Sequence, residues 1–252
     1  MLTQSRILRD WLAELPDDAF AAPTVLEAWD VRILTGHLVG VHTRLIEALR
    51  QPTREAAVPV HELVRRYRRD AAMIMDWTLA LAGDHSGPEL VRQLSAAIDE
   101  LAEALRPEAS RPKVIMTPRG PGRTTDFIAT RIVDLVVHAD DLSRSLPDRP
   151  PVASHRPALA GCTRTLAAFL AAQQPGKSIE VRVPPFAAVQ CSIGEPGPTH
   201  TRGTPPNVVE TDPVTFLRLA TGRLDWAEAR AAGRVSASGP RADLSAALPV
   251  LS

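Results

Sequence analysis

Asp134 and His138 stand four residues apart in an apolar run that reads RIVDLVVHADDL from Arg131 to Leu142. On a helix, this spacing places both side chains on one face, so a carboxylate and an imidazole could bind the same ion. His37, in a second helix-like run about a hundred residues earlier, could supply a third ligand. Three protein ligands with an open fourth position describe a catalytic divalent-metal site rather than a structural one.

The residues around Asp134 leave a simpler interpretation open. A carboxylate within an apolar helix needs a partner, and Arg131, three residues earlier, could form an ion pair with it. A lone histidine such as His37 is more often a hydrogen-bonded core residue than a ligand. Asp141, three residues after His138, could accept a hydrogen bond from the second ring nitrogen of a ligating histidine. It could equally belong to a solvated helix end.

Helices must position these side chains, and the N-terminal part of the chain has the pattern for several. Apolar residues recur at helical spacing over residues 3–15, 30–50, 60–82 and 88–105. Asp30 is expected to cap the second of these helices. The proline-rich stretch 106–122 predicts a loop or an extended connection. Thr124 or Thr125 should then cap the last helix of this part, which carries the Asp134 run and ends near Leu146.

A cluster of prolines marks the predicted domain boundary, because Pro147, Pro150 and Pro151 cannot continue a helix. Beyond it, a helix over residues 155–173 precedes three short runs that predict strands, at 178–184, 186–193 and 207–211. Asp212 could cap a helix through Arg223, and the end of the chain suggests a last strand and a helix. We therefore expect an α+β protein, with a helical bundle at residues 1–148 and an α+β domain with an antiparallel sheet at residues 152–252.

Composition narrows the class of protein. The chain has 252 residues, of which 44% are hydrophobic and 23% are charged, and its 29 basic and 29 acidic residues cancel. This balance predicts neither a nucleic-acid partner nor an anionic membrane partner. No segment approaches the ~20 apolar residues of a membrane span, so a soluble cytoplasmic protein is expected. Cys162 and Cys191 lie far apart without zinc-finger spacing and are expected to be buried thiols.

Three segments form a set that is typical of one family. They are Trp29-Asp30-Val31 followed by Gly36-His37-Leu38, the segment TPRGPGRTTDFIATRIVDLVVHADDL, and the tail DPVTFLRLATGRLDWAEARAAGRVSASG. Together they resemble the mycothiol-dependent maleylpyruvate isomerase family over nearly the whole chain. The resemblance implies a DinB-like four-helix bundle followed by a smaller sterol-carrier-like α+β domain. It also implies a divalent metal, usually zinc, on His37, Asp134 and His138, although the family's acid is usually Glu and here it is the shorter Asp134.

The resemblance further implies two cofactors, a divalent metal and mycothiol, and a reaction. A metal-activated thiolate adds to a cis double bond conjugated to a carbonyl, the bond rotates, and elimination leaves the trans isomer. Related enzymes transfer the thiol to electrophiles, so isomerase and transferase both stay open. The partners are then a small-molecule substrate and a low-molecular-weight thiol, and the oligomeric state is left open. In the family an arginine of the C-terminal domain assists the reaction, and Arg223 is the candidate here, unless it simply meets the last carbonyls of its helix.

The competing hypothesis is a non-enzymatic protein. In it, the sterol-carrier-like domain binds a lipid or another small ligand, and the metal site is structural or degenerate. The substitution of Asp134 for Glu and an aromatic content of only 4% keep this hypothesis open. Fold-level similarity cannot separate a binding module from an enzyme. Metal content would separate the two hypotheses, and a simpler structural check is whether His37, Asp134 and His138 converge on a common point.

Overall fold

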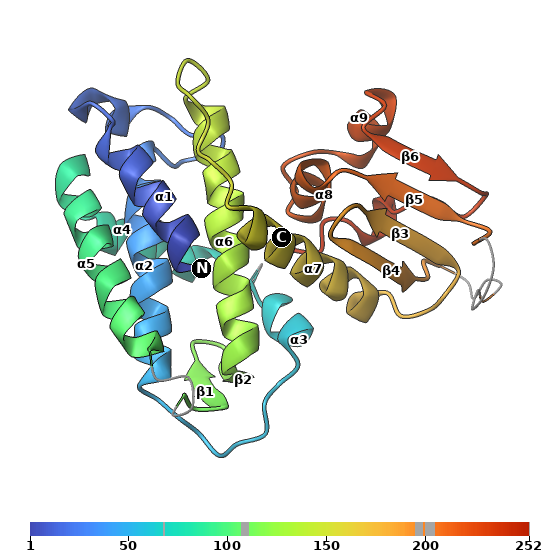
Figure 1. Cartoon of the computed structure of the whole chain (residues 1–252), viewed down its shortest axis with the longest axis horizontal. Helices are drawn as coiled ribbons and strands as arrows, with labels where there is room; N and C mark the ends of the chain where they lie inside the picture. Colours follow the sequence, from blue (N-terminus) through green and yellow to red (C-terminus); the bar gives the residue numbers. More distant parts are fainter. Residues whose placement is uncertain (68, 107–110, 195–198, 200–204, 252) are drawn as a thin grey trace. The chain divides into compact units, whose positions relative to one another are not determined.

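The computed structural model describes residues 1–67, 69–106, 111–194, 199 and 205–251 (Figure 1). The chain forms two compact units, Met1–Ala158 and Leu159–Ser252. The division falls within the helix α7 (Arg156–Gln173). The fold class is α+β, as predicted, and the domain ranges 1–148 and 152–252 stay a prediction.

The first unit is a bundle in which α2 is central. Its helices are α1 (Leu2–Ala13), α2 (Val31–Leu49), α3 (Val60–Val64), α4 (Ala71–Ala82), α5 (Gly87–Leu105) and α6 (Thr124–Ser145), with a 3-10 turn η1 (Asp17–Ala21). α2 packs against α4, α5 and α6, and α1 packs against α5 and α6 (Figure 1). A shared core of this unit contains Leu8, Leu12, Leu34, Leu38, Leu94, Ile98, Leu135 and Leu142. Burial of these side chains stabilises the helices that carry the candidate ligands.

Asp30 fixes the start of α2. Its side chain accepts a hydrogen bond from the backbone N–H of Ile33 at 2.6 Å, which confirms the predicted N-cap. Two glycines on α2 then allow α4 to approach closely. A Cβ atom on Gly36 would lie 3.1 Å from Ala82, and one on Gly40 would lie 1.8 Å from the Trp77 ring. A side chain at Gly40 would therefore overlap the Trp77 ring, whereas one at Gly36 would make a tight contact with Ala82.

The prediction of one helix over residues 60–82 is wrong, since α3 and α4 are separate. The chain between them is held by partners from a hairpin that lies much later in the sequence. Arg66 donates a hydrogen bond to the carbonyl of Arg119 at 2.7 Å, and Asp70 lies 3.1 Å from the Arg119 guanidinium. The helical spacing of apolar residues contains no information on such long-range contacts, so it could not predict where the helix is interrupted between α3 and α4.

The stretch 106–122 is not a simple loop. Residues 107–110 lie outside the described residues, but the rest contains an antiparallel hairpin of β1 (Val114–Thr117) and β2 (Gly120–Arg123). Pro118 occupies the turn, and Pro121 lies in a two-stranded ribbon, where every strand is an edge strand that tolerates proline. Neither Thr124 nor Thr125 caps α6, because the helix begins at Thr124 with Arg123 as N-cap. The Thr124 hydroxyl instead donates a hydrogen bond to the Pro112 carbonyl.

The second unit contains most of α7 and a four-stranded sheet. The remaining elements are β3 (Ile179–Val183), β4 (Ala187–Cys191), β5 (Val208–Thr211), α8 (Pro213–Ala220), α9 (Trp226–Ala231), β6 (Val235–Ser238) and a 3-10 turn η3 (Ser245–Ala247). The strand order is β4-β3-β5-β6, and β3 pairs with β5 in parallel. The sheet is therefore mixed, where the sequence predicted an antiparallel one. Because β4 runs antiparallel to β3, it returns the chain to the end of the sheet at which β3 begins. β5 starts from that same end and therefore runs parallel to β3.

The ends of the second unit differ from the prediction in three details. Asp212 caps α8 as predicted, accepting hydrogen bonds from the backbone of Val214 and Thr215 at 2.9 and 3.0 Å. α8 stops at Ala220, short of Arg223. The six-residue α9 was not predicted, and the last predicted helix is only the turn η3.

Both cysteines are buried, as predicted, and they form no disulfide with each other. Burial raises the pKa of Cys191 to about 11, so this thiol is a weak nucleophile. Within the described residues, no helix has both the length and the apolar character needed to cross a membrane.

Candidate functional site

His37 on α2 and His138 on α6 meet inside the bundle. Their ring centroids are 4.9 Å apart and the ring planes are inclined by 80°. His138 is 7% exposed and His37 is half-buried, so the pair keeps some contact with solvent, mainly through His37. Two imidazoles that bind one zinc ion at ~2.0–2.1 Å have centroids about 5 Å apart. The spacing of this pair is therefore the spacing that a shared metal ion requires.

The Nδ1 atom of each histidine already has a polar neighbour. The Nδ1 of His138 lies 3.0 Å from Oδ2 of Asp141, which is completely buried, and the Nδ1 of His37 lies 3.2 Å from Oγ1 of Thr78. The predicted contact between Asp141 and His138 is confirmed. A carboxylate behind Nδ1 fixes the ring and favours the tautomer that leaves Nε2 for ligation. Nε2 is thus the atom of each ring that a metal would bind.

Indole rings surround the histidine pair. The Trp29 centroid lies 5.1 Å from that of His37 and 6.4 Å from that of His138, and Trp77 lies 6.4 Å from His37. Trp29 follows Ala28, whose φ of 64° is rare for a residue with a side chain. Thr24 holds this turn by donating its hydroxyl to the Trp29 carbonyl at 2.9 Å. The strained turn thus presents the Trp29 ring to both imidazoles.

Asp134, the third predicted ligand, pairs with an arginine. Its Oδ2 lies 3.0 Å from Nη1 of Arg131, so the simpler interpretation of this carboxylate describes the structure. Burial alone would lower the pKa of Arg131, but Asp134 and Tyr67 outweigh burial and hold that pKa above its usual value. Among the described residues, no three His, Cys, Asp or Glu side chains are grouped so that they could hold one metal ion. The fold therefore assembles two of the three predicted ligands and directs the third to Arg131.

The donor set nevertheless suits a divalent metal. Two imidazoles and one carboxylate are ligands of the type found in catalytic zinc sites. Asp134 lies one helical turn before His138 and its side chain is 20% exposed, so rotation of this side chain is not blocked by full burial. A metal site here requires Asp134 to turn away from Arg131 or to share its two oxygens.

Arg223 lies in the second unit, just beyond α8. Its backbone N–H donates to the Arg218 carbonyl at 2.7 Å, and its Nη1 donates to the Thr221 carbonyl at 2.8 Å. These are the contacts expected of an arginine that meets the last carbonyls of a helix. A role of Arg223 in the reaction stays a prediction.

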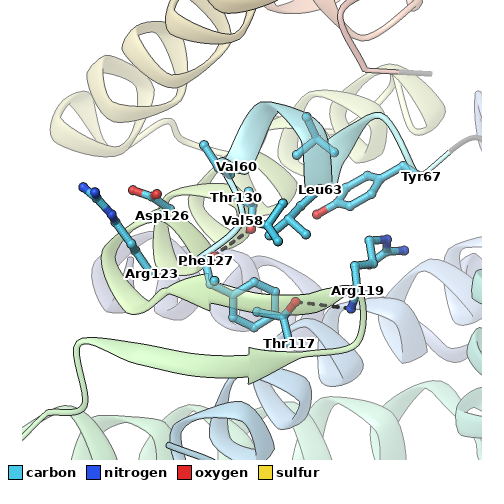
Figure 2. Close-up of a pocket in the computed structure, with 12 residues that line it drawn as sticks. Val58, Val60, Leu63, Tyr67, Thr117, Arg119, Arg123, Asp126, Phe127 and Thr130 are labelled. Atoms are coloured by element: carbon cyan, nitrogen blue, oxygen red, sulfur yellow. Dashed lines mark hydrogen bonds between the residues drawn. The ribbon is translucent and has the colours of Figure 1, made fainter. Parts of the chain in front are cut away.

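A small pocket lies near the start of α6, apart from the histidine pair (Figure 2). Its cavity volume is only about 20 Å³, and its wall is largely apolar. The lining residues are Val58, Val60, Leu63, Val64, Tyr67, Thr117, Arg119, Gly122, Arg123, Asp126, Phe127 and Thr130. They come from α3, the hairpin and the first turns of α6. This pocket could not be predicted from the sequence pattern, because neither the hairpin nor the break before α4 was predicted.

Three residues that line this pocket, Tyr67, Phe127 and Thr130, also contact Arg131. Tyr67 accepts a hydrogen bond from Nη2 of Arg131 at 2.9 Å, and the Arg131 guanidinium lies 4.8 Å from the centroid of the Phe127 ring. Thr130 is 3.4 Å from the Arg131 Nε. Arg131 thus lies between the pocket wall and Asp134.

Comparisons with known proteins agree with this architecture. Residues 2–143 match the family model described as the mycothiol maleylpyruvate isomerase N-terminal domain. Residues 155–250 match the model described as a bacterial SCP ortholog. No functionally curated protein matches the chain.

Two solved structures share its fold. A crystal structure of the mycothiol-dependent maleylpyruvate isomerase is 17% identical with a TM-score of 0.57, and that of a histidine-to-alanine mutant is 16% identical with a TM-score of 0.56. Each alignment covers 96% of this chain and 94% of the other. At this identity the likeness establishes the fold, while the first family model matches more than half of the chain. The chain therefore belongs to the mycothiol-dependent maleylpyruvate isomerase family.

Proposed function

We propose that this protein is a mycothiol-using isomerase or thiol transferase whose cofactor thiol is activated by a divalent metal, zinc in the first instance. His37 and His138 bind the metal through Nε2, and Asp134 supplies the third ligand. The observation that carries the proposal is the 4.9 Å separation of the two imidazole centroids at a partly exposed site. Membership of the family supports mycothiol as the thiol.

A divalent metal and a thiol would together supply the chemistry of this reaction. When bound, a divalent metal lowers the pKa of the thiol, so that its sulfur can add reversibly to a double bond conjugated to a carbonyl and let that bond rotate. The same activated sulfur could attack an electrophile in a transferase. No cysteine of this chain is required, which agrees with the burial of Cys162 and Cys191.

The chain's own residues hold and shield the metal ligands. Asp141 and Thr78 occupy the Nδ1 sides of the rings and keep each Nε2 oriented. Trp29 and Trp77 cover the imidazoles with apolar surface, which lowers the local dielectric and strengthens charge interactions at the site. Half-buried His37 and Asp134 leave one side open for a thiol and a substrate.

Zinc binding and thiol chemistry test the proposal together. The purified chain, loaded with zinc and dialysed, should hold about one ion, and His138→Ala should lose it while keeping its fold. His85→Ala, a change at an exposed position between α4 and α5, is the matched control and should retain the ion. Isomerisation of maleylpyruvate and consumption of mycothiol by an electrophile should both be assayed, with and without zinc.

The outcomes separate the two hypotheses for this protein. Zinc-dependent turnover of either substrate with mycothiol supports the enzyme. An empty wild-type site under zinc-replete conditions, or zinc retained in His138→Ala, contradicts it. Tight binding of an acyl ligand together with an empty metal site would favour the sterol-carrier-like binding module instead.

A further inference from the structure

We propose that Arg131 sets the metal affinity of this site by competing with the metal for the Asp134 carboxylate. This inference rests on the proposed function, since it concerns the third ligand of the same site. Arg131 is a positioning residue in this view, because it acts through Asp134 and touches neither thiol nor substrate. The consequence is a site with two fixed imidazole ligands and one ligand whose availability is regulated.

Arg131 is held firmly where it can retain Asp134. Its side chain is 10% exposed, its Nη2 donates to the Tyr67 hydroxyl at 2.9 Å, and its guanidinium packs over the Phe127 ring at 4.8 Å. The remaining interaction is the 3.0 Å contact between its Nη1 and Oδ2 of Asp134. Little conformational entropy is left to lose when this pair forms, so it is stronger than a pair between two mobile surface side chains.

The helix places the two partners of Asp134 in opposite directions. Arg131 lies three residues before Asp134, toward the start of α6, and His138 lies four residues after it. Aspartate has one methylene less than glutamate with which to span this distance. A carboxylate that turns toward Arg131 therefore moves away from the imidazole pair, which agrees with the absence of a three-ligand group among the described residues.

Charge acts in the same sense. The guanidinium carries a fixed positive charge, and a divalent cation bound beside it would be repelled at close range in a partly buried site. Metal binding must therefore break or share the ion pair, and this cost reduces the affinity. Replacing Arg131 by an uncharged side chain of similar length should raise the affinity for zinc by about tenfold or more, the loss expected for one hydrogen bond between charged groups.

The test measures the zinc affinity of the full chain by competition with a chromophoric chelator. Arg131→Met should bind zinc about tenfold more tightly than the wild type. Arg144→Met removes the same charge from the same helix, on the other side of His138, and should change the affinity little. Arg131→Met should give no gain in an Asp134→Asn background, because coupling is lost when the partner is removed.

A second variant covers the case in which Arg131→Met does not fold. Arg131→Lys keeps the charge but lacks the planar fork that bonds Tyr67 and Asp134 together, and it should bind zinc about two- to threefold more tightly. Circular dichroism and thermal unfolding establish that each variant is folded.

Each outcome decides the inference. Equal gains in Arg131→Met and Arg144→Met would show a general effect of charge and would overturn it, as would a gain that persists in Asp134→Asn. Wild-type affinity in folded Arg131→Met would show that Arg131 does not compete for Asp134, and weaker affinity would show that Arg131 assists Asp134; either result overturns the inference. Zinc bound by the wild type and lost in His138→Ala, with no gain in Arg131→Met, refutes only this inference. The absence of zinc binding in every variant refutes the proposed function as well.

Discussion

Asp141→Asn tests how the His138 ring is held for its proposed task. The Asp141 side chain is completely buried, and its Oδ2 lies 3.0 Å from Nδ1 of His138. Asparagine has nearly the same shape as aspartate, so the change removes a charge and keeps the side-chain volume. We expect the bundle to fold and the zinc affinity of the site to fall.

The size of the loss follows from the hydrogen bond that changes. A bond to a charged acceptor contributes about 1.5–3 kcal/mol and a bond between neutral groups about 0.5–1.5 kcal/mol, so about 1–1.5 kcal/mol is lost, or about tenfold in Kd. The amide of asparagine can also rotate and donate to Nδ1, which would move the ring proton of His138 to Nε2. A protonated Nε2 cannot bind a metal, so the total loss should lie between about 10-fold and 100-fold.

The assay is a zinc competition titration at neutral pH, with circular dichroism as the check on folding. Asp126→Asn is the matched control, because it removes one carboxylate from the first turn of α6, beside Thr125. Wild-type zinc affinity in folded Asp141→Asn would refute the argument that the buried carboxylate orients His138. An equal loss in Asp126→Asn would assign the effect to net charge instead.

Three further predictions concern the bundle. Burial lowers the pKa of His42 to about 4, well below the value of about 6.5 for an exposed histidine, so between these pH values the unfolded chain binds a proton that the folded chain does not. The contribution of His42 to the free energy of unfolding is therefore fully present above about pH 6.5 and decreases by about 3 kcal/mol on going down to about pH 4, which urea unfolding can measure. An equal decrease in His42→Gln would show that another group is responsible. Gly40→Ala should displace the Trp77 ring and shift its fluorescence emission, and it should lower the free energy of unfolding by about 1–3 kcal/mol, more than Gly36→Ala does. Unchanged Trp77 emission in Gly40→Ala would contradict the close packing of Gly40 against that ring. Asp30→Ala should lower the free energy of unfolding by about 1 kcal/mol, and an unchanged value would show that the cap contributes nothing.

Helical periodicity was sufficient to predict most of the bundle, because α1 and α5 each bury one apolar face, while α2 and α6 are long apolar runs that are buried over much of their circumference. It also predicted the partner of His138, since Asp141 lies three residues away on the same helix. Such local relations depend only on spacing within one element. Such relations can therefore be predicted from the sequence without knowledge of how the helices and strands pack.

Contacts between different helices and strands could not be predicted from spacing along the sequence. Thr78 and Trp77 reach His37 only because Gly36 and Gly40 let α4 lie against α2, and the sequence does not state which helix fills that space. The break before α4 depends on hairpin residues that are distant in sequence. The parallel pairing of β3 and β5 likewise depends on where the chain enters the sheet after β4.

The competition for Asp134 explains why spacing alone gave two interpretations of one residue. Arg131 and His138 lie at the two helical offsets that can reach Asp134, so both the ion pair and the metal site agree with the pattern. The structure adds that Tyr67, from outside α6, and Phe127, one turn earlier on α6, hold Arg131, which favours the ion pair when no metal is bound. The imidazole pair does not depend on that choice, because Asp141 and Thr78 hold each ring independently of Asp134. A shorter acid thus separates the two parts of the site, so that the histidines fix where a metal would bind and the carboxylate determines how tightly.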